Sequence, residues 1–179
     1  MKILDNTIQD YTGTNFSVYK REEGETIIKY NTSGDIIENN EMYSKVMLGK
    51  CETCNPFYKN SFNGFSYDTV LVVGLGLGLV PQELSEVNKC SKIDVLEIDQ
   101  EIIDYTISSG HLNSDINLIQ GDIYNYTTTE TYDLIIIDTI WYAHEMSNED
   151  CELLKSRLLP NINTGGALYF PIKEKFIIR

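Results

Sequence analysis

The segment spanning residues 69–99 constrains the fold of this chain more than any other part of the sequence. It opens with an unbroken apolar run at residues 70–73, which is too short for a helix and predicts a strand buried on both faces. The sequence GLGLG follows, with Gly74, Gly76 and Gly78 at every second position. Such a turn lets the backbone approach a ligand where a Cβ would block it. Pro81 then suits the first turn of a helix.

A second predicted strand, residues 92–96, ends at Glu97, and Asp99 lies two residues further on. Strand, glycine turn, helix, strand and terminal carboxylate form one half of a nucleotide-binding α/β sheet. The Glu97 carboxylate lies about twenty residues beyond the turn, where it could hold both hydroxyls of a ribose.

From residue 69 onward, predicted strands alternate with predicted helices. We therefore expect an α/β, Rossmann-like fold with a mostly parallel sheet of five or six strands flanked by helices. Further strands are predicted at residues 116–119, 134–137, 167–170 and 176–178.

Two helices of this region have clear end signals. One spans residues 100–109, ends at Gly110 and buries a face of Ile102, Ile103, Thr106 and Ile107. The other follows a capping box between Ser147 and Asp150, ends before Pro160 and buries a face of Leu153, Leu154, Arg157 and Leu158.

The N-terminal part has a different pattern. Short β-rich runs at residues 17–21, 26–30 and 35–38, separated by turns, predict a small β-meander. A joining helix is predicted from Asn40 to a stop at Gly49. We therefore divide the chain into a β-rich region (1–50), a connection (51–68) and a nucleotide-binding domain (69–179).

Composition excludes several classes of function. The chain has 179 residues and a formal net charge of −13, which repels nucleic acid phosphates and anionic membranes and suits a cationic ligand. No apolar run approaches the ~18 residues of a membrane span, and no signal peptide is recognised. The pair Cys51 and Cys54 lacks the second pair that a zinc site needs, so we expect no metal, free thiols and a cytoplasmic location.

Acidic residues follow three of the predicted strands, at Glu97, Asp122 and Asp138. Because ligands of open parallel sheets bind at the carboxyl ends of the strands, these acids and the glycine turn predict one site. Leu79 stands where a dinucleotide fingerprint has its third glycine, and no Walker lysine follows. A ring of acids disfavours a pyrophosphate and favours S-adenosylmethionine, which carries a sulfonium and an ammonium.

Four motifs in this order resemble those of class I S-adenosylmethionine-dependent methyltransferases: VLVVGLGLGLVPQE (70–83), DVLEID (94–99), QGD (120–122) and YDLIIID (132–138). More narrowly, they resemble the spermidine synthase (polyamine aminopropyltransferase) family, which also carries a small N-terminal β-domain. GDIIENNEMYSKVML (34–48) looks like the segment that joins that domain to the core.

The resemblance implies the binding residues of the nucleotide. The three glycines of the turn would pass beneath the nucleoside, and Glu97 would hold the ribose hydroxyls. Asp122 would face the adenine amine, with Ile123 beside the ring.

The resemblance also implies where the chemistry takes place. Asp138 would lie near the amino-acid end of the nucleotide and the reacting carbon, and Tyr43 resembles a tyrosine of the family's entrance helix. His144 is a candidate general base, for which an exposed polar role is the alternative. Trp141 and Tyr142 could contact a sulfonium through their ring faces or could simply pack.

Two departures from the spermidine synthase pattern count against aminopropyl transfer. Leu77 replaces an aspartate of the turn, and Trp141 replaces the second aspartate of a D-S-x-D-P-like pattern. Relative to that family the chain is also expected to be shortened at its C-terminus, which could leave an open sheet edge for an oligomer to cover.

Three functions remain open. The first is methyl transfer from S-adenosylmethionine to a small-molecule acceptor, and the second is aminopropyl transfer from its decarboxylated form to a polyamine, a cationic amine. The third is a non-catalytic or nucleotide-cleaving homologue.

Overall fold

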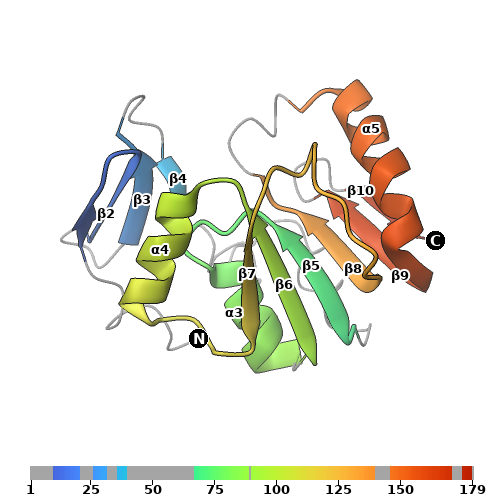
Figure 1. The fold of residues 1–179 in the computed structure, drawn as a ribbon, viewed down its shortest axis with the longest axis horizontal. Coiled ribbons are helices and arrows are strands. Elements are labelled where there is room, and N and C mark those ends of the chain that lie inside the picture. The colour runs from blue at the N-terminus through green and yellow to red at the C-terminus, as the bar shows by residue number, and fades with distance from the viewer. Residues whose placement is uncertain are drawn as a thin grey trace, which may run out of the picture.

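The computed structural model describes residues 10–20, 26–31, 36–39, 67–88, 90–139, 146–170 and 175–178. Within these residues the chain forms two separate sheets, one of four strands and one of six. Figure 1 shows the small N-terminal sheet next to helix α4. Helix α5 lies at the opposite end of the molecule (Figure 1).

The N-terminal sheet is an antiparallel meander, as the turn signals predict. Its strands, in spatial order, are β1 (Tyr11–Thr12), β2 (Phe16–Lys20), β3 (Thr26–Tyr30) and β4 (Ile36–Asn39). Strand β1 was not predicted, because two residues carry no periodicity.

The larger sheet confirms the predicted fold class. Its strands, in chain order, are β5 (Thr69–Val73), β6 (Lys92–Glu97), β7 (Ile116–Gln120), β8 (Tyr132–Ile137), β9 (Ile162–Phe170) and β10 (Lys175–Ile178). They lie side by side in the order β10-β9-β8-β5-β6-β7. All neighbours pair in parallel except β10, which runs antiparallel to β9.

Strand β9 begins five residues earlier than predicted, at Ile162. The prediction missed this half because Gly165 and Gly166 indicate a turn in sequence. In the structure Gly165 has φ +84° within the strand, and a Cβ on Gly166 would lie 2.7 Å from the Asp133 carbonyl oxygen. The two glycines therefore allow β9 to pair irregularly with β8, at the point where the register shifts between Tyr132 and Leu134.

Among the described helices, the two with predicted bounds begin and end where the sequence signals predict. The described helices are α3 (Leu79–Glu83) with a π-helical continuation (Leu84–Asn88), α4 (Gln100–Ser109), and α5 (Asn148–Leu158) with a 3₁₀ turn (Leu159–Asn161). Asp99 caps α4 by accepting a hydrogen bond from the Glu101 amide at 2.9 Å, and Gly110 ends it with φ +62°. Ser147 and Asp150 form the predicted capping box of α5.

The predicted buried faces were wrong at one position of each of these helices. Ile107 is 65% exposed and Leu153 is 47% exposed. In α4 the buried residues include Ile102, Tyr105 and Thr106, and at about 100° per residue Ile107 is turned away from the centre of that arc.

The sheet is buried on both faces, as the apolar run at residues 70–73 predicts. Val70 and Val72 point into a core shared with α3, α4 and the N-terminal sheet. Leu71 and Val73 point into a second core, shared with α5.

The N-terminal sheet packs against α4 through aromatic side chains. Phe16 is fully buried, and the ring centroids of Tyr11 and Tyr105 lie 4.9 Å apart. The predicted helix at residues 40–49 and most of the connection at 51–68 lie outside the described residues, so the domain division stays a prediction. In the part of the chain that is described, no helix combines the length and apolar character needed to cross a membrane.

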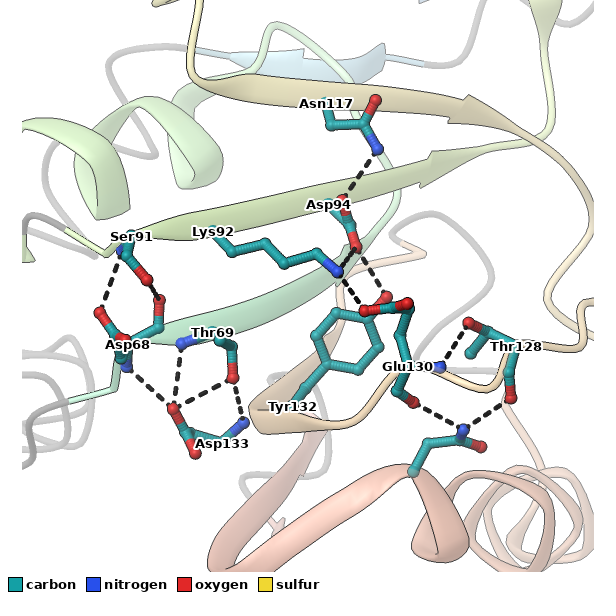
Figure 2. A network of polar contacts seen from close by, with 11 residues as sticks. Asp68, Thr69, Ser91, Lys92, Asp94, Asn117, Thr128, Glu130, Tyr132 and Asp133 are labelled. Atoms are coloured by element: carbon teal, nitrogen blue, oxygen red, sulfur yellow. Dashed lines mark hydrogen bonds and ion pairs between the residues drawn. The ribbon is translucent and has the colours of Figure 1, made fainter.

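A polar network joins strands near their amino ends (Figure 2). Asp94 is only 3% exposed, and its carboxylate accepts hydrogen bonds from the Tyr132 hydroxyl and the side-chain amide of Asn117, each at 2.8 Å. The carboxylate also lies 3.4 Å from the Lys92 ammonium. A buried carboxylate needs such partners because an unpaired charge is costly in the interior.

Asp133 forms the other half of this network and ties β8 to the start of β5. One of its oxygens accepts from the backbone amides of Asp68 and Thr69, each at 3.0 Å (Figure 2). The other oxygen accepts from the side-chain amide of Asn163 at 2.8 Å. Burial alone would raise the pKa of Asp133, but these hydrogen bonds outweigh it and lower the pKa.

Replacing Asp133 by alanine should lower the free energy of unfolding by about 1–3 kcal/mol, because two backbone amides lose their acceptor. Urea unfolding measures this. Since the folded-state pKa is lowered, the contribution is present above the unfolded pKa of about 3.9 and is lost as the pH falls through the folded-state pKa, so the difference between wild type and variant should shrink on acidification.

Glu130→Ala is the matched control, because Glu130 pairs with Lys92 at the surface. Its effect should stay below about 1 kcal/mol. An equal loss in the two variants would contradict the special role given to Asp133.

Candidate functional site

The sheet reverses its order at β5, which lies between β6 and β8. Ligands of open α/β sheets bind at the carboxyl end of such a switch point. A cavity of about 480 Å³ lies there, within the range of about 300–1,000 Å³ typical of small-molecule sites. It is lined by Val73, Gly74, Leu75, Gly76, Leu96, Glu97, Ile98, Ile102, Gly121, Asp122, Ile123, Tyr124, Asp138, Thr139, Met146 and Asp150.

The glycine turn shapes the floor of this cavity. Gly74 has φ +100°, and a Cβ on it would lie 2.3 Å from the carbonyl oxygen of Asp138. Gly78 has φ +74° and begins α3, and a Cβ there would lie 2.5 Å from the Leu112 side chain. Glycine is therefore favoured at both positions by backbone conformation, and at Gly74 also by the fixed backbone of Asp138.

Glu97 fastens the turn to the end of β6. Its two carboxylate oxygens accept from the amides of Leu75 at 2.8 Å and Asp99 at 2.9 Å, and the residue is 7% exposed. Burial raises the pKa of Glu97, and the hydrogen bonds from Asp99 and Leu75 only partly offset this. Each carboxylate oxygen has a second lone pair, so Glu97 can still accept hydrogen bonds from a ligand in the cavity.

Asp122 and Ile123 follow β7. The Asp122 carboxylate accepts from the Tyr124 amide at 2.9 Å and the Asn125 side chain at 2.8 Å, which closes a turn. Ile123 is 6% exposed and Tyr124 is 38% exposed. The turn thus presents an apolar and an aromatic side chain to the cavity beside a carboxylate.

Asp138 follows β8, with its backbone amide bonded to the Val73 carbonyl at 2.8 Å. Burial raises the pKa of Asp138 to about 7. Asp150 comes from the first turn of α5 and is the fourth carboxylate of the lining. Among the described lining residues there are four acidic side chains and no Lys, Arg or His, so the cavity favours a cationic ligand.

Most of the sequence-predicted cofactor residues come together in this cavity: Gly74, Gly76, Glu97, Asp122, Ile123 and Asp138. Gly78 is not part of the lining and lies behind the turn, against Leu112. Tyr43, His144, Trp141 and Tyr142 lie outside the described residues, so their predicted roles stay predictions.

The interpretation of Leu77 needs correction. Sequence reasoning treated it as a ligand-facing position that had lost an aspartate, yet Leu77 is fully buried in the core and absent from the lining. The Leu77 side chain therefore says nothing about which nucleotide the cavity prefers, and an aspartate placed there would be a buried charge.

Several lining residues were not predicted as site residues, including Ile98, Tyr124, Met146 and Asp150. Ile98 could have been found, because it lies in the sequence directly between Glu97 and Asp99, after the second predicted strand; the structure leaves its side chain 61% exposed. Met146 and Asp150 could not, because only the packing of α5 brings them to the cavity.

The described residues offer no alternative centre of metal or thiol chemistry. Among them, no group of three or more His, Cys, Asp or Glu side chains is placed to hold a metal ion. Cys90 and Cys151 are buried free thiols. Burial raises the pKa of Cys90 to about 11, so its reactive thiolate is scarce at neutral pH. Cys51 and Cys54 lie outside the described residues.

No protein-family model and no curated protein matches this chain. Solved structures with the same fold include a complex of DhpI with S-adenosylhomocysteine, with 18% identity and a TM-score of 0.54, covering 73% of this chain and 61% of that one. The plantazolicin methyltransferase BpumL, with a monoazolic substrate analogue and S-adenosylhomocysteine, has 23% identity and a TM-score of 0.53, covering 73% and 48%.

Coclaurine N-methyltransferase, bound to N-methylheliamine and S-adenosylhomocysteine, has 20% identity and a TM-score of 0.52, covering 64% of this chain and 33% of that one. The matched region thus spans between one third and about three fifths of these three proteins. At these identities the likeness establishes a Rossmann-like methyltransferase fold.

Gly74→Ala should lower the free energy of unfolding by at least about 2 kcal/mol, because it adds a strained φ and a clash with the Asp138 carbonyl. Gly110→Ala is the matched control, since Gly110 also has positive φ but open space around its Cβ position. It should cost only about 1–2 kcal/mol, for the backbone strain. Equal losses in urea unfolding would contradict the close approach of the turn to β8.

Proposed function

We propose that this chain binds S-adenosylmethionine in the cavity at the carboxyl ends of β5, β6 and β8 and transfers its methyl group to a small molecule. The observation that carries the proposal is the pairing of Glu97 with the glycine turn inside an acid-lined, largely apolar cavity.

The residues of the cavity fit this nucleotide. Glu97 has the free lone pairs that a ribose diol needs, and Ile98 and Ile123 supply apolar surface for a base. The carboxylates of Asp122 and Asp138 suit an adenine amine and a positive charge. A nucleotide phosphate would find no basic side chain among the described lining residues.

Methyl transfer asks little covalent chemistry of the protein. When bound, S-adenosylmethionine would supply a methyl group already activated by its sulfonium. The chain's part is then to hold an acceptor in line with that methyl and to exclude water. Asp138 is the candidate to orient the acceptor and to take the proton that an amine or hydroxyl acceptor releases, because its pKa is about 7.

The structural neighbours support this proposal without naming the acceptor. Two of them are methyltransferases whose structures hold S-adenosylhomocysteine together with a plantazolicin analogue or N-methylheliamine. We therefore propose a small organic or peptide-like acceptor; an amine suits the acidic lining best, because it can bind as its cation and attack after passing a proton to Asp138.

Aminopropyl transfer, as in spermidine synthases, is the second candidate. The acidic lining and the antiparallel N-terminal sheet favour it, and the burial of Leu77 removes one argument against it. A non-catalytic or nucleotide-cleaving protein is the third. The cytoplasmic location and an oligomer both stay predictions.

Calorimetric titration of the purified chain with S-adenosylmethionine, S-adenosylhomocysteine and decarboxylated S-adenosylmethionine tests the proposal. We expect the carboxylated nucleotides to bind more tightly than the decarboxylated one. In Glu97→Gln the affinity for S-adenosylhomocysteine should fall at least about tenfold, because glutamine keeps one acceptor oxygen and replaces the other with an NH2 donor. Glu152→Gln is the control, since Glu152 pairs with Lys155 at the surface of α5, and it should bind as wild type does.

Tighter binding of the decarboxylated nucleotide would replace methyl transfer by aminopropyl transfer. No binding of any of the three would leave the non-catalytic candidate. Unchanged affinity in Glu97→Gln would contradict the ribose role of Glu97.

The charge of Asp138 should make the affinity for S-adenosylmethionine depend on pH more strongly than the affinity for S-adenosylhomocysteine. Because its raised pKa is about 7, the carboxylate is mostly neutral below that pH and charged above it. Between about pH 6 and pH 8, the affinity for S-adenosylmethionine should rise about threefold to tenfold more than that for S-adenosylhomocysteine, which lacks the sulfonium charge. Asp138→Asn should remove the difference, and a difference that survives in this variant would contradict the assignment.

A further inference from the structure

The turn between β1 and β2 binds the carboxylate of Glu101, which belongs to helix α4. Glu101, in the first turn of α4, accepts hydrogen bonds from the Thr14 amide at 2.6 Å, the Asn15 amide at 2.7 Å and the Tyr11 hydroxyl at 3.0 Å. Burial alone would raise the pKa of Glu101, but these hydrogen bonds outweigh it and lower the pKa. The carboxylate is therefore held in its charged form by the N-terminal sheet.

The turn is shaped around this carboxylate. A Cβ on Gly13 would clash with a carboxylate oxygen of Glu101, so an alanine there would push the Glu101 side chain out of the turn. The Gly13 amide donates to the Phe16 carbonyl at 2.9 Å. The side-chain amide of Asn31, which directly follows β3, donates to the Gly13 carbonyl at 2.7 Å. The sheet thus holds the turn in a shape that receives Glu101.

A continuous chain of hydrogen bonds runs from this turn to the nucleotide cavity. The Asn15 side chain donates to the Asp99 carboxylate at 3.1 Å, and the Asp99 amide donates to Glu97 at 2.9 Å. The other oxygen of Glu97 accepts from the Leu75 amide in the glycine turn. Ile102, next to Glu101 in α4, lines the cavity directly.

We infer that Glu101 is a positioning residue of the nucleotide site: it docks the N-terminal sheet onto the first turn of α4 and so holds Asp99, Glu97 and the glycine turn in their binding arrangement. This inference rests on the proposed function for the identity of the ligand. Glu101 is not part of the cavity lining, so its effect on binding is transmitted through the start of α4.

Coupling of this kind is reciprocal. If docking of the N-terminal sheet favours nucleotide binding, a bound nucleotide must stabilise the docked sheet by the same factor. Amide hydrogen exchange in β1 and β2 should therefore slow when S-adenosylhomocysteine binds wild type.

The test uses the full chain and Glu101→Gln. The glutamine side chain keeps one acceptor oxygen and places its NH2 group against either the Thr14 or the Asn15 amide, which weakens the docking while keeping the size of the side chain. We expect affinity for S-adenosylhomocysteine to fall about threefold to tenfold. Asp104→Asn is the matched control, because it removes the same charge from the same exposed helix face, where Asp104 accepts from Gln100, and its affinity should stay within about twofold of wild type.

A second variant and a second measurement separate this inference from the function on which it rests. Gly13→Ala should reproduce the loss of affinity, because its Cβ displaces Glu101 from the turn. Hydrogen exchange of the Leu75 and Asp99 amides needs no ligand, and both amides should exchange faster in Glu101→Gln than in Asp104→Asn.

Unchanged affinity and unchanged exchange in Glu101→Gln and Gly13→Ala would overturn the inference. If wild type binds no S-adenosyl nucleotide, the proposed function fails, and the exchange of the Leu75 and Asp99 amides decides the inference alone. Faster exchange would then support it, and equal exchange would overturn it.

Discussion

The buried carboxylate of Glu97 is the interaction on which the rest of the site depends. It accepts one hydrogen bond from a backbone amide of the glycine turn after β5 and another from the backbone amide of Asp99, at the start of α4. Burying a charge is costly, and here part of the cost is offset by the hydrogen bonds that connect the end of β6 to the glycine turn after β5. Glu97 thus both shapes the cavity and presents its carboxylate to it.

Much of the fold could be predicted because local signals and burial agree. Alternation of apolar runs with capped, periodic segments was enough for the parallel sheet, and Gly110 and Ser147 marked helix ends within one residue. Long-range packing was not predictable in the same way. Met146 joins the cavity only because α5 folds back over the strand ends, and no local pattern in the sequence records that return.

The glycine turn shows where a motif can mislead. Every second residue of GLGLG is a glycine, and both leucines between them are buried in the same core, but only Leu75 also lines the cavity. A resemblance between motifs aligns positions along the chain and carries no information about which way a side chain turns. Only the structure could distinguish a lost ligand contact from a residue that packs the interior.

The network of Asp94 and Asp133 joins β5, β6 and β8 near their amino ends, whereas the cavity opens at their carboxyl ends. The two sets of side chains share strands but no residues. Because effects at well-separated positions combine almost additively, selection could reshape the acceptor side of the cavity while the opposite edge preserves the folded state. A substitution beside the cavity then changes stability by its own cost alone and leaves the contribution of the network at the amino ends unchanged.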